Sequence, residues 1–214
     1  MAKISGALLS FGAAGTIGKT VTFARWKGQP YARQRVVPSN PNSTAQQLTR
    51  GVFANGSNVW KNAGALLIAP WNSFALGQVL TGRNAFMSKF VSLNRGETDL
   101  QSMQFSPGAK GGVPLVSATP TPGDDQVTVV CVPPTPPTGW TVDSCVVAVI
   151  PDQDPETMTD YISSEASDNS DPYSINIASL LDATAYVGGA WPVWTKPDGS
   201  LAYGPSTEFT FTTT

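Results

Sequence analysis

The sequence predicts a mixed fold: an extended N-terminal arm with a β-hairpin, then short helices, then an all-β sandwich. Three observations indicate it. Residues 1–110 carry twelve Lys and Arg against two acidic residues, whereas residues 111–214 carry one Lys against thirteen acidic residues. Gly and Pro number 20 and 18 while only 13% of residues are charged, which is typical of strands and turns. β-rich runs then dominate the second half. The opposite charges suggest modules with different neighbours.

The first module, residues 1–42, is expected to be an extended basic arm. Residues 20–26 alternate between polar and apolar side chains, and a turn over residues 27–30 leads into residues 31–37, so a β-hairpin is predicted. A lone hairpin is marginally stable in water, so this arm should need a partner surface. The aromatic side chains of Phe23, Trp26 and Tyr31 argue against a disordered tail.

Residues 43–105 are expected to form a short helical anchoring module. Ser43 and Gln46 have the spacing of a capping box, which predicts a helix start, and apolar residues at helical spacing follow as far as residue 63. A second helix is predicted to start at Pro70, a favoured first helical position. A third should carry Phe86 and Phe90 after a break at residues 81–83.

Residues 106–113, rich in Gly and Pro, are predicted to be a linker, and the sign of the charge changes beside them. The remaining residues, 114–214, have the texture of a seven-strand sandwich. The β-rich runs are separated by Pro, Asp and Gly clusters, and residues 196–200 should close the last hairpin. These runs are residues 126–132, 140–150, 173–177, 183–194 and 201–213.

The sandwich segment resembles the fibronectin type III domains of the immunoglobulin-like class. Leu180, Thr184 and Tyr186 have the spacing of that family's pattern, in which the tyrosine forms a corner before the sixth strand. Cys131, however, stands where the family usually has a core tryptophan. The resemblance covers residues 113–214 and implies an immunoglobulin-like or fibronectin III-like sandwich.

The first half resembles a family of largely uncharacterised virion proteins from tailed phages and prophages. The resemblance spans roughly 80 residues, and it implies a virion component without implying a position in the virion. The segments that carry it are residues 15–23, 26–33, 38–46 with Arg50, and 81–86. Two cysteines without a disulfide framework agree with assembly in the reducing host cytoplasm.

Composition argues against an enzyme. Histidine is absent, which removes Ser-His-Asp and Cys-His catalysis and the usual general base near neutral pH. Residues 13–20 fit a relaxed P-loop pattern, but a P-loop must open a helix, whereas residues 21–26 alternate as a strand. We therefore expect no catalytic residues and no cofactor. The best apolar run, residues 63–71, is too short to span a bilayer, so no membrane contact is expected.

Two further patterns leave alternatives open. Asp152, Asp154 and Glu156 alternate as calcium ligands can, but the EF-hand glycine and glutamate are missing, so a solvated acidic loop is favoured and no metal site is predicted. Cys131 and Cys145 are expected on adjacent strands as small core residues. The sequence does not decide whether they form a disulfide.

We expect a non-enzymatic structural protein of a phage virion, first of all a capsid decoration or head-associated protein. Its basic half would bind other phage structural proteins, in multiple copies, and display the sandwich. Aromatic and Arg side chains dominate interface energetics, so six residues of the arm are the expected partner-binding residues. They are Phe23, Arg25, Trp26, Tyr31, Arg33 and Arg35.

Two other hypotheses remain. A tail or head-tail junction protein fits the same sequence features. A nucleic-acid-binding protein is a hypothesis of another class, because Lys and Arg neutralise phosphates and Trp26 or Tyr31 can stack on bases. The cations are spread along the chain and no nucleic-acid motif is present, which favours protein partners.

Overall fold

The structure is a computed structural model that describes residues 2–3, 14–26, 29–37, 39–40, 42–101, 103–109, 112–161 and 163–214. Contacts divide the chain into two compact units, Met1–Asn42 and Ser43–Thr214. The first unit is called the sheet unit below, and the second is called the main unit. None of the main unit's helices is long and apolar enough to cross a bilayer.

The sheet unit contains short antiparallel strands in the order β1-β4-β3-β2. Strands β3 and β4 form a hairpin in which residue 21 pairs with residue 34 and residue 26 with residue 29. The turn residues 27 and 28 lie outside the described residues. The strands are β1 (Ala2–Lys3), β2 (Gly15–Ile17), β3 (Val21–Trp26) and β4 (Gln29–Gln34).

The main unit contains a β-sandwich, as the sequence predicts, but its described part has eight strands rather than seven. One sheet has the order β5-β6-β9, and the other has the order β11-β10-β7-β8, with β12 pairing further along the same edge of β10 as β11. A hydrophobic cluster that includes Val127, Val147 and Ile175 fills the space between the sheets. The strands are β5 (Ser117–Gly123), β6 (Gln126–Val132), β7 (Thr141–Pro151), β8 (Ser164–Asp168), β9 (Tyr173–Ala178), β10 (Ala185–Thr195), β11 (Leu201–Tyr203) and β12 (Thr207–Thr212).

Two of these strands form from segments whose local pattern does not predict a strand. Strand β5 contains Pro120 and Pro122, which cannot donate to a ladder, and it lies at the edge of its sheet, where proline is tolerated. Strand β8 is short and polar and also lies at an edge. Both strands have weak β propensity, so packing rather than local sequence places them.

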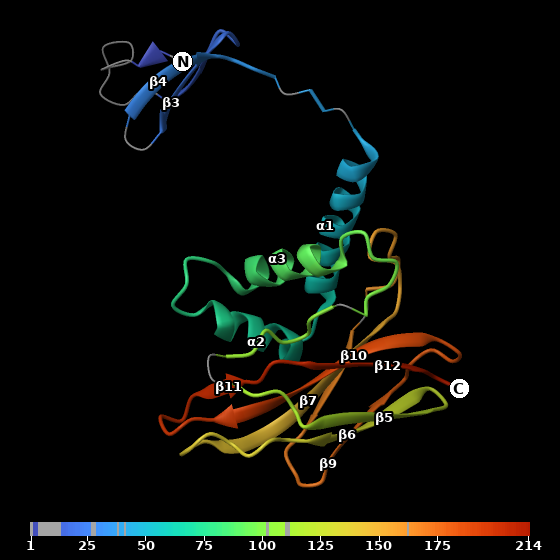
Figure 1. Ribbon diagram of the computed structural model, residues 1–214. Coiled ribbons are helices and arrows are strands. Elements are labelled where there is room, and N and C mark those ends of the chain that lie inside the picture. Colours follow the sequence, from blue (N-terminus) through green and yellow to red (C-terminus); the bar gives the residue numbers. More distant parts are fainter. Residues whose placement is uncertain are drawn as a thin grey trace. The chain divides into compact units, whose positions relative to one another are not determined.

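Helices cover the outer face of the larger sheet (Figure 1). Strands β7 and β10 are consequently buried on both faces, and residues 145–151 and 186–194 are buried without alternation. Trp191 and Ile150 belong to the cluster shared with Trp71 and Phe86 of the helices. The helices are α1 (Thr44–Asn62), α2 (Ala65–Ala75) and α3 (Gly82–Asn94).

The helical segment and the sandwich therefore share one core. The sequence analysis treated residues 43–105 and 114–214 as separate modules joined by a linker. In the structure Met103, Phe105 and Ser106 are fully buried. The Ser106 backbone N–H and hydroxyl group bond to β-sandwich residues, the latter to the Gly204 carbonyl at 2.7 Å. Trp71 Nε1 donates to the Phe105 carbonyl at 2.9 Å, which fixes the same segment to α2.

Helix α2 begins five residues before the predicted start at Pro70, which lies inside the helix and is buried. The reason is a tertiary contact. The backbone N–H groups of Leu66 and Leu67 donate to the two carboxylate oxygens of Glu165 in β8, at 3.1 and 2.8 Å. A carboxylate at a helix N-terminus satisfies orphan N–H groups and favours the helix dipole. No local sequence pattern around Ala65 reveals a cap supplied from 99 residues away.

Helix α1 starts after Ser43, where the sequence predicts, but without the expected side-chain cap. Gln46 bonds through its backbone N–H to the Ser43 carbonyl at 2.9 Å, and its Oε1 atom has no partner within the described part of the chain. Helix α3 does have a side-chain cap, because Thr81 Oγ1 accepts the Asn84 N–H at 3.3 Å. Phe86 and Phe90 are buried as predicted.

Candidate partner-binding site

The six predicted partner-binding residues lie on or beside the β3-β4 hairpin, where the register divides them between two faces. Residues paired across an antiparallel ladder share a face, and successive residues alternate. Phe23 pairs with Ala32, so Phe23 and Arg25 lie on one face. Arg33 pairs with Thr22 and Tyr31 with Ala24, which places Arg33 and Tyr31 on the other face.

The remaining two residues are fixed mainly through their backbones. Trp26 pairs with Gln29 at the turn end of the hairpin, and its side chain lies outside the described residues. Arg35 follows β4, and its N–H donates to the Thr20 carbonyl at 2.7 Å. The hairpin thus brings the residues into one small sheet without gathering them on one face.

An apolar stripe, formed by Ile17, Val21 and Phe23, runs across the face that carries Phe23. The sequence pattern did not predict that Ile17 belongs to it. Ile17 in β2 pairs with Val21 in β3, and both are exposed, at 50% and 37%. Phe23 is only partly buried. The alternation of residues 21–26 was a signal for Val21, whereas no strand was predicted at Ile17. Three apolar side chains on one face make a surface suited to contact with another protein.

The sheet unit has no core of its own among the residues whose side chains are described. In residues 14–25, 29–37, 39–40 and 42 every side chain is exposed or partly exposed. All the buried residues of the described chain belong to the main unit. Residues 1–42 also contain six basic and no acidic residues, so the charged side chains of this segment are all positive.

Of the residues that resemble a P-loop, residues 15–17 form strand β2 and residues 18–20 form a turn, and strand β3 follows. Lys19 lies in the turn with φ 56°, in the left-handed region. The strand predicted after Thr20 is present, so no helix N-terminus stands there to bind a phosphate.

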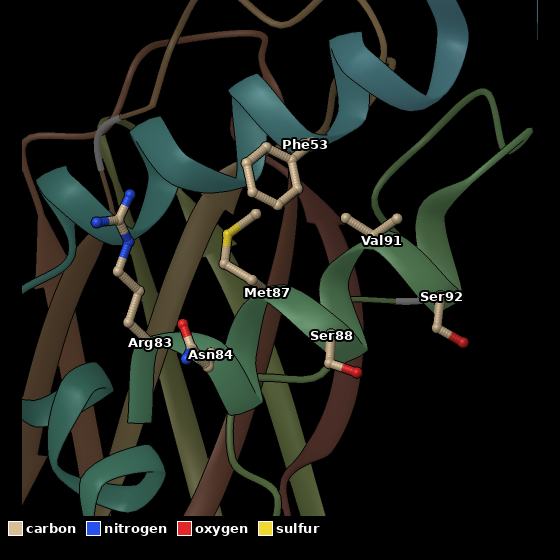
Figure 2. A pocket seen from close by; sticks show the side chains of 7 residues that line it. All are labelled: Phe53, Arg83, Asn84, Met87, Ser88, Val91 and Ser92. Carbon is tan, nitrogen blue, oxygen red and sulfur yellow. The ribbon is translucent and has the colours of Figure 1, made fainter. Parts of the chain in front are cut away.

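A second candidate surface is an open groove between α1 and α3, with a volume of about 730 Å³. Figure 2 shows the Phe53 ring beside the Met87 side chain, with Val91 next to them and Arg83 reaching from α3 toward α1. Phe53 is 55% exposed, although it lies on a helix whose neighbouring residue Val52 is fully buried. The sequence analysis did not single out this groove.

The acidic residues after β7 have structural partners. The Leu100 N–H donates to Asp152 Oδ1 at 2.8 Å, and the Glu156 N–H donates to Asp154 Oδ1 at 2.8 Å. Asn55 of α1 donates to the Pro155 carbonyl at 3.0 Å, so α1 packs on the same loop. Among the described residues there is no group of three acidic, His or Cys side chains placed to hold a metal ion.

Cys131 and Cys145 are buried free thiols that face each other from opposite sheets, in β6 and β7. The two strands follow one another in the chain, as expected, but they are not paired, since β6 pairs with β5 and β9 while β7 pairs with β8 and β10. The hydrogen bond from one thiol to the other, together with burial, raises the pKa of Cys145. The pair behaves as part of the core in this structure.

The corner predicted from the fibronectin pattern is present. The Leu181 N–H donates to the Tyr186 hydroxyl oxygen at 2.9 Å, and the Tyr186 ring stacks on Phe211 with centroids 5.4 Å apart. A tyrosine at the start of a strand that bonds to backbone a few residues upstream is the tyrosine corner of such sandwiches.

Comparisons with solved structures return fibronectin type III and other β-sandwich domains. A fibronectin type III domain of human collagen XX is 14% identical, with a TM-score of 0.34, over 47% of this chain and 92% of that one. Solution structures of the fn3 domain of the human collagen alpha-1(XX) chain give 16% identity, a TM-score of 0.35, and 50% and 90% coverage. A redesigned β-sandwich protein gives 19% identity, a TM-score of 0.34, and 47% and 88% coverage.

No protein-family model matches the sequence, and no curated protein matches it. At these TM-scores the fold assignment rests on the strand order and the tyrosine corner described above. The main unit is thus a fibronectin type III-like β-sandwich whose larger sheet is covered by three helices.

Proposed function

We propose that this chain is a non-enzymatic structural protein of a tailed-phage particle, and that its sheet unit anchors it to other proteins of that particle. A capsid decoration or head-associated protein is the first choice. The observation that carries the proposal is the exposed apolar stripe of Ile17, Val21 and Phe23 on a basic sheet that has no buried side chain in its described part.

Such a sheet gains too little free energy by folding alone, because no side chain in its described part is buried. An isolated hairpin or small sheet without a buried face is at best marginally stable in water. Docking the stripe on a partner would bury its apolar side chains and add the favourable free energy of apolar burial that the free sheet lacks. The main unit needs no such help, because it contains two hydrophobic clusters of its own.

The phage assignment is supported by the resemblance of the first half to tailed-phage virion proteins. The residues that carry it include the β2-β3 segment and the hairpin that contains Tyr31 and Arg33. A tail or head-tail junction protein would use the same anchor and is the second candidate. In both cases the protein is incorporated in multiple copies and the main unit is displayed.

Nucleic-acid binding is less well supported by the geometry. Arg25 shares a face with Phe23 and the apolar stripe, whereas Arg33 shares the other face with Tyr31. A groove that follows a nucleic-acid backbone gathers its cations on one surface, whereas the register divides Arg25 and Arg33 between the two faces. Here one of the two faces is mainly apolar, which suits a protein partner better.

The test is incorporation into phage particles by complementation. A chain lacking residues 1–42 should stay folded but be absent from purified particles. Phe23→Asp should block incorporation, because it places a carboxylate in the stripe that docking would bury. Thr22→Asp, one residue away on the opposite face, is the matched control and should be incorporated.

Particles that contain the truncated chain at wild-type levels would contradict the anchoring role. If Phe23→Asp is tolerated and Thr22→Asp is not, the opposite face is the binding face. Tight DNA binding by the full chain at physiological salt, lost on removal of residues 1–42, would favour the nucleic-acid function instead.

A further inference from the structure

The groove between α1 and α3 has the charge and shape of a docking site. Its floor is apolar, with Phe53, Met87 and Val91, and Arg83 stands at its side (Figure 2). A second hollow lined by Arg50 and Arg95 lies along the same two helices. With 13 residues, α3 is about 20 Å long, and its residues 83–92 provide most of the groove lining.

The helical segment contributes only positive charge to this groove. Residues 43–96 contain five Lys and Arg and no acidic residue. An apolar floor with a basic side chain beside it favours an occupant that presents an apolar side chain next to a carboxylate. The sheet unit does not have that chemistry, because residues 1–42 contain no acidic residue.

The sandwich presents such a surface, called the acidic tip below and formed by Asp124, Asp125, Leu181 and Asp182. The first two residues lie in the β5-β6 turn and the last two in the β9-β10 loop. The Asp125 N–H donates to Asp182 Oδ1 at 3.3 Å, which holds turn and loop together. Leu181 is 59% exposed and directly precedes Asp182 in the loop.

Leu181 is exposed but its backbone is rigidly held. Its N–H donates to the Tyr186 hydroxyl oxygen at 2.9 Å, and its carbonyl accepts from Thr213 Oγ1 at 2.6 Å. The preceding Leu180 N–H donates to the Asp125 carbonyl at 2.8 Å. A pre-ordered apolar side chain loses little conformational freedom on binding, which favours a role as an anchor.

The carboxylates of the tip repel one another. The neighbouring Asp182, through its hydrogen bond and its charge, raises the pKa of Asp125, and Asp124 adds to the effect. A cation placed against the tip would relieve this repulsion.

We propose that the acidic tip of one copy of this chain docks in the α1-α3 groove of a second copy, with Leu181 against Phe53 and Asp182 beside Arg83. A second copy is the favoured occupant because the chain itself carries both complementary surfaces. The groove lies on the helical layer, whereas the tip lies at the turns of the sandwich (Figure 1). The contact is head-to-tail, so repetition gives a ring where the rotation closes and a filament where it does not.

This contact is independent of the anchoring role of residues 1–42, and sedimentation velocity of the full chain tests it. The wild type should associate in a concentration-dependent way. Raising NaCl from about 0.1 M to about 1 M should weaken the association, because the screening length falls from about 10 Å to about 3 Å. Arg83→Glu and Asp182→Arg should each weaken association at least about tenfold.

A mixture of the two variants is the decisive sample. The groove of the Arg83→Glu variant is acidic and matches the basic tip of the Asp182→Arg variant. The tip of the first variant and the groove of the second are unchanged and also match, so mixing should restore association. Leu181→Lys serves as a second tip variant should Asp182→Arg unfold the loop. Lys61→Glu, an equal charge change at the exposed end of α1, is the control and should associate as the wild type does.

Three results would overturn the proposal. One is a wild-type chain that stays monomeric at its solubility limit. Another is association that Arg83→Glu leaves unchanged, which would assign it to another surface such as the sheet unit. The third is a mixture of folded variants that fails to associate.

Discussion

At the scale of single residues, Glu165 determines where helix α2 begins. Its carboxylate accepts two backbone N–H bonds from the first turn of α2 and links the helical layer to β8. Gly64 lies directly against the same carboxylate, and a Cβ atom at this position would overlap with Glu165 Oε1. The close approach requires glycine at position 64 because of space rather than backbone conformation.

We therefore predict that Gly64→Ala destabilises the protein by about 1–2 kcal/mol, the usual range for loss of a helix cap. Chemical denaturation measures the change. Glu165→Ala should cost a similar amount, and the double variant should cost clearly less than the sum, because both substitutions remove one interaction. Additive effects would mean that the carboxylate is not the group that Gly64 accommodates.

Tyr186 is the second residue with a measurable role. Its hydroxyl oxygen accepts the Leu181 N–H and fixes the β9-β10 loop. Tyr186→Phe should destabilise the main unit by about 1–2 kcal/mol, because it leaves that N–H without its partner. Incorporation into particles should be little affected. An unchanged melting temperature would contradict the role of this corner.

The pKa shifts of Asp168 and Asp125 predict opposite effects of pH on the stability of the protein. Hydrogen bonds from the Ser170 side chain and backbone lower the pKa of Asp168 below its ordinary 3.8, so its stabilisation is present above that pH and lost as the pH falls through the lowered value. The pKa of Asp125 is raised, so its unfavourable effect develops as the pH rises through the raised value. Asp168→Asn should lower stability at neutral pH.

Asp125→Asn should raise stability at neutral pH. It also suits the left-handed backbone at position 125, where φ is 53°, since asparagine tolerates that conformation. Urea denaturation at pH 7 and at pH 3 checks both signs, since the charge-dependent differences should shrink at the lower pH. Equal effects of the two substitutions at pH 7 would contradict the assigned causes.

At the scale of elements, the shared face between the helices and the larger sheet is the main difference from the sequence-based organisation. Residues 145–150 and 186–194 are mostly apolar without alternation. A sheet with one face in water should alternate, so uninterrupted runs indicate burial on both faces. That signal predicts a covering layer, and the helices before the sandwich supply it.

The prediction at this scale concerns fragments. Residues 114–214 alone would expose Val146, Ile150 and Trp191, all buried under the helices. This fragment should aggregate or bind a hydrophobic dye, whereas residues 43–214 should unfold in one cooperative transition. Dye fluorescence and calorimetry of the two fragments measure this. A stable, monomeric 114–214 fragment would show that the helical layer is dispensable.

The elements themselves were largely predictable from local patterns. The strand at residues 126–132, the helix start after Ser43 and the buried Phe86 all follow from periodicity or capping residues. The start of α2, the edge strands β5 and β8, and the burial of Phe105 depend on contacts between residues far apart in sequence. The groove at Phe53 depends in the same way on the pairing of α1 and α3.

At the scale of the whole molecule, the charge boundary and the structural boundary differ. The net charge changes sign near residue 110, but the units divide after Asn42. Basic helices and an acidic sandwich therefore belong to one main unit, whereas the sheet unit contains basic residues and no acidic ones. Residues 43–214 contain the hydrophobic clusters that stabilise the fold, and we propose that residues 1–42 attach it to the particle.

Hydrogen exchange of the full chain, free and within purified particles, tests that claim most directly. In the free chain the amides of β7 and β10 should exchange slowly, and those of β3 and β4 quickly, because the sheet has no buried side chain in its described part. In particles the β3 and β4 amides should become protected. Protection of β3 and β4 in the free chain equal to that of β7 and β10, or no gain of protection in particles, would contradict the account.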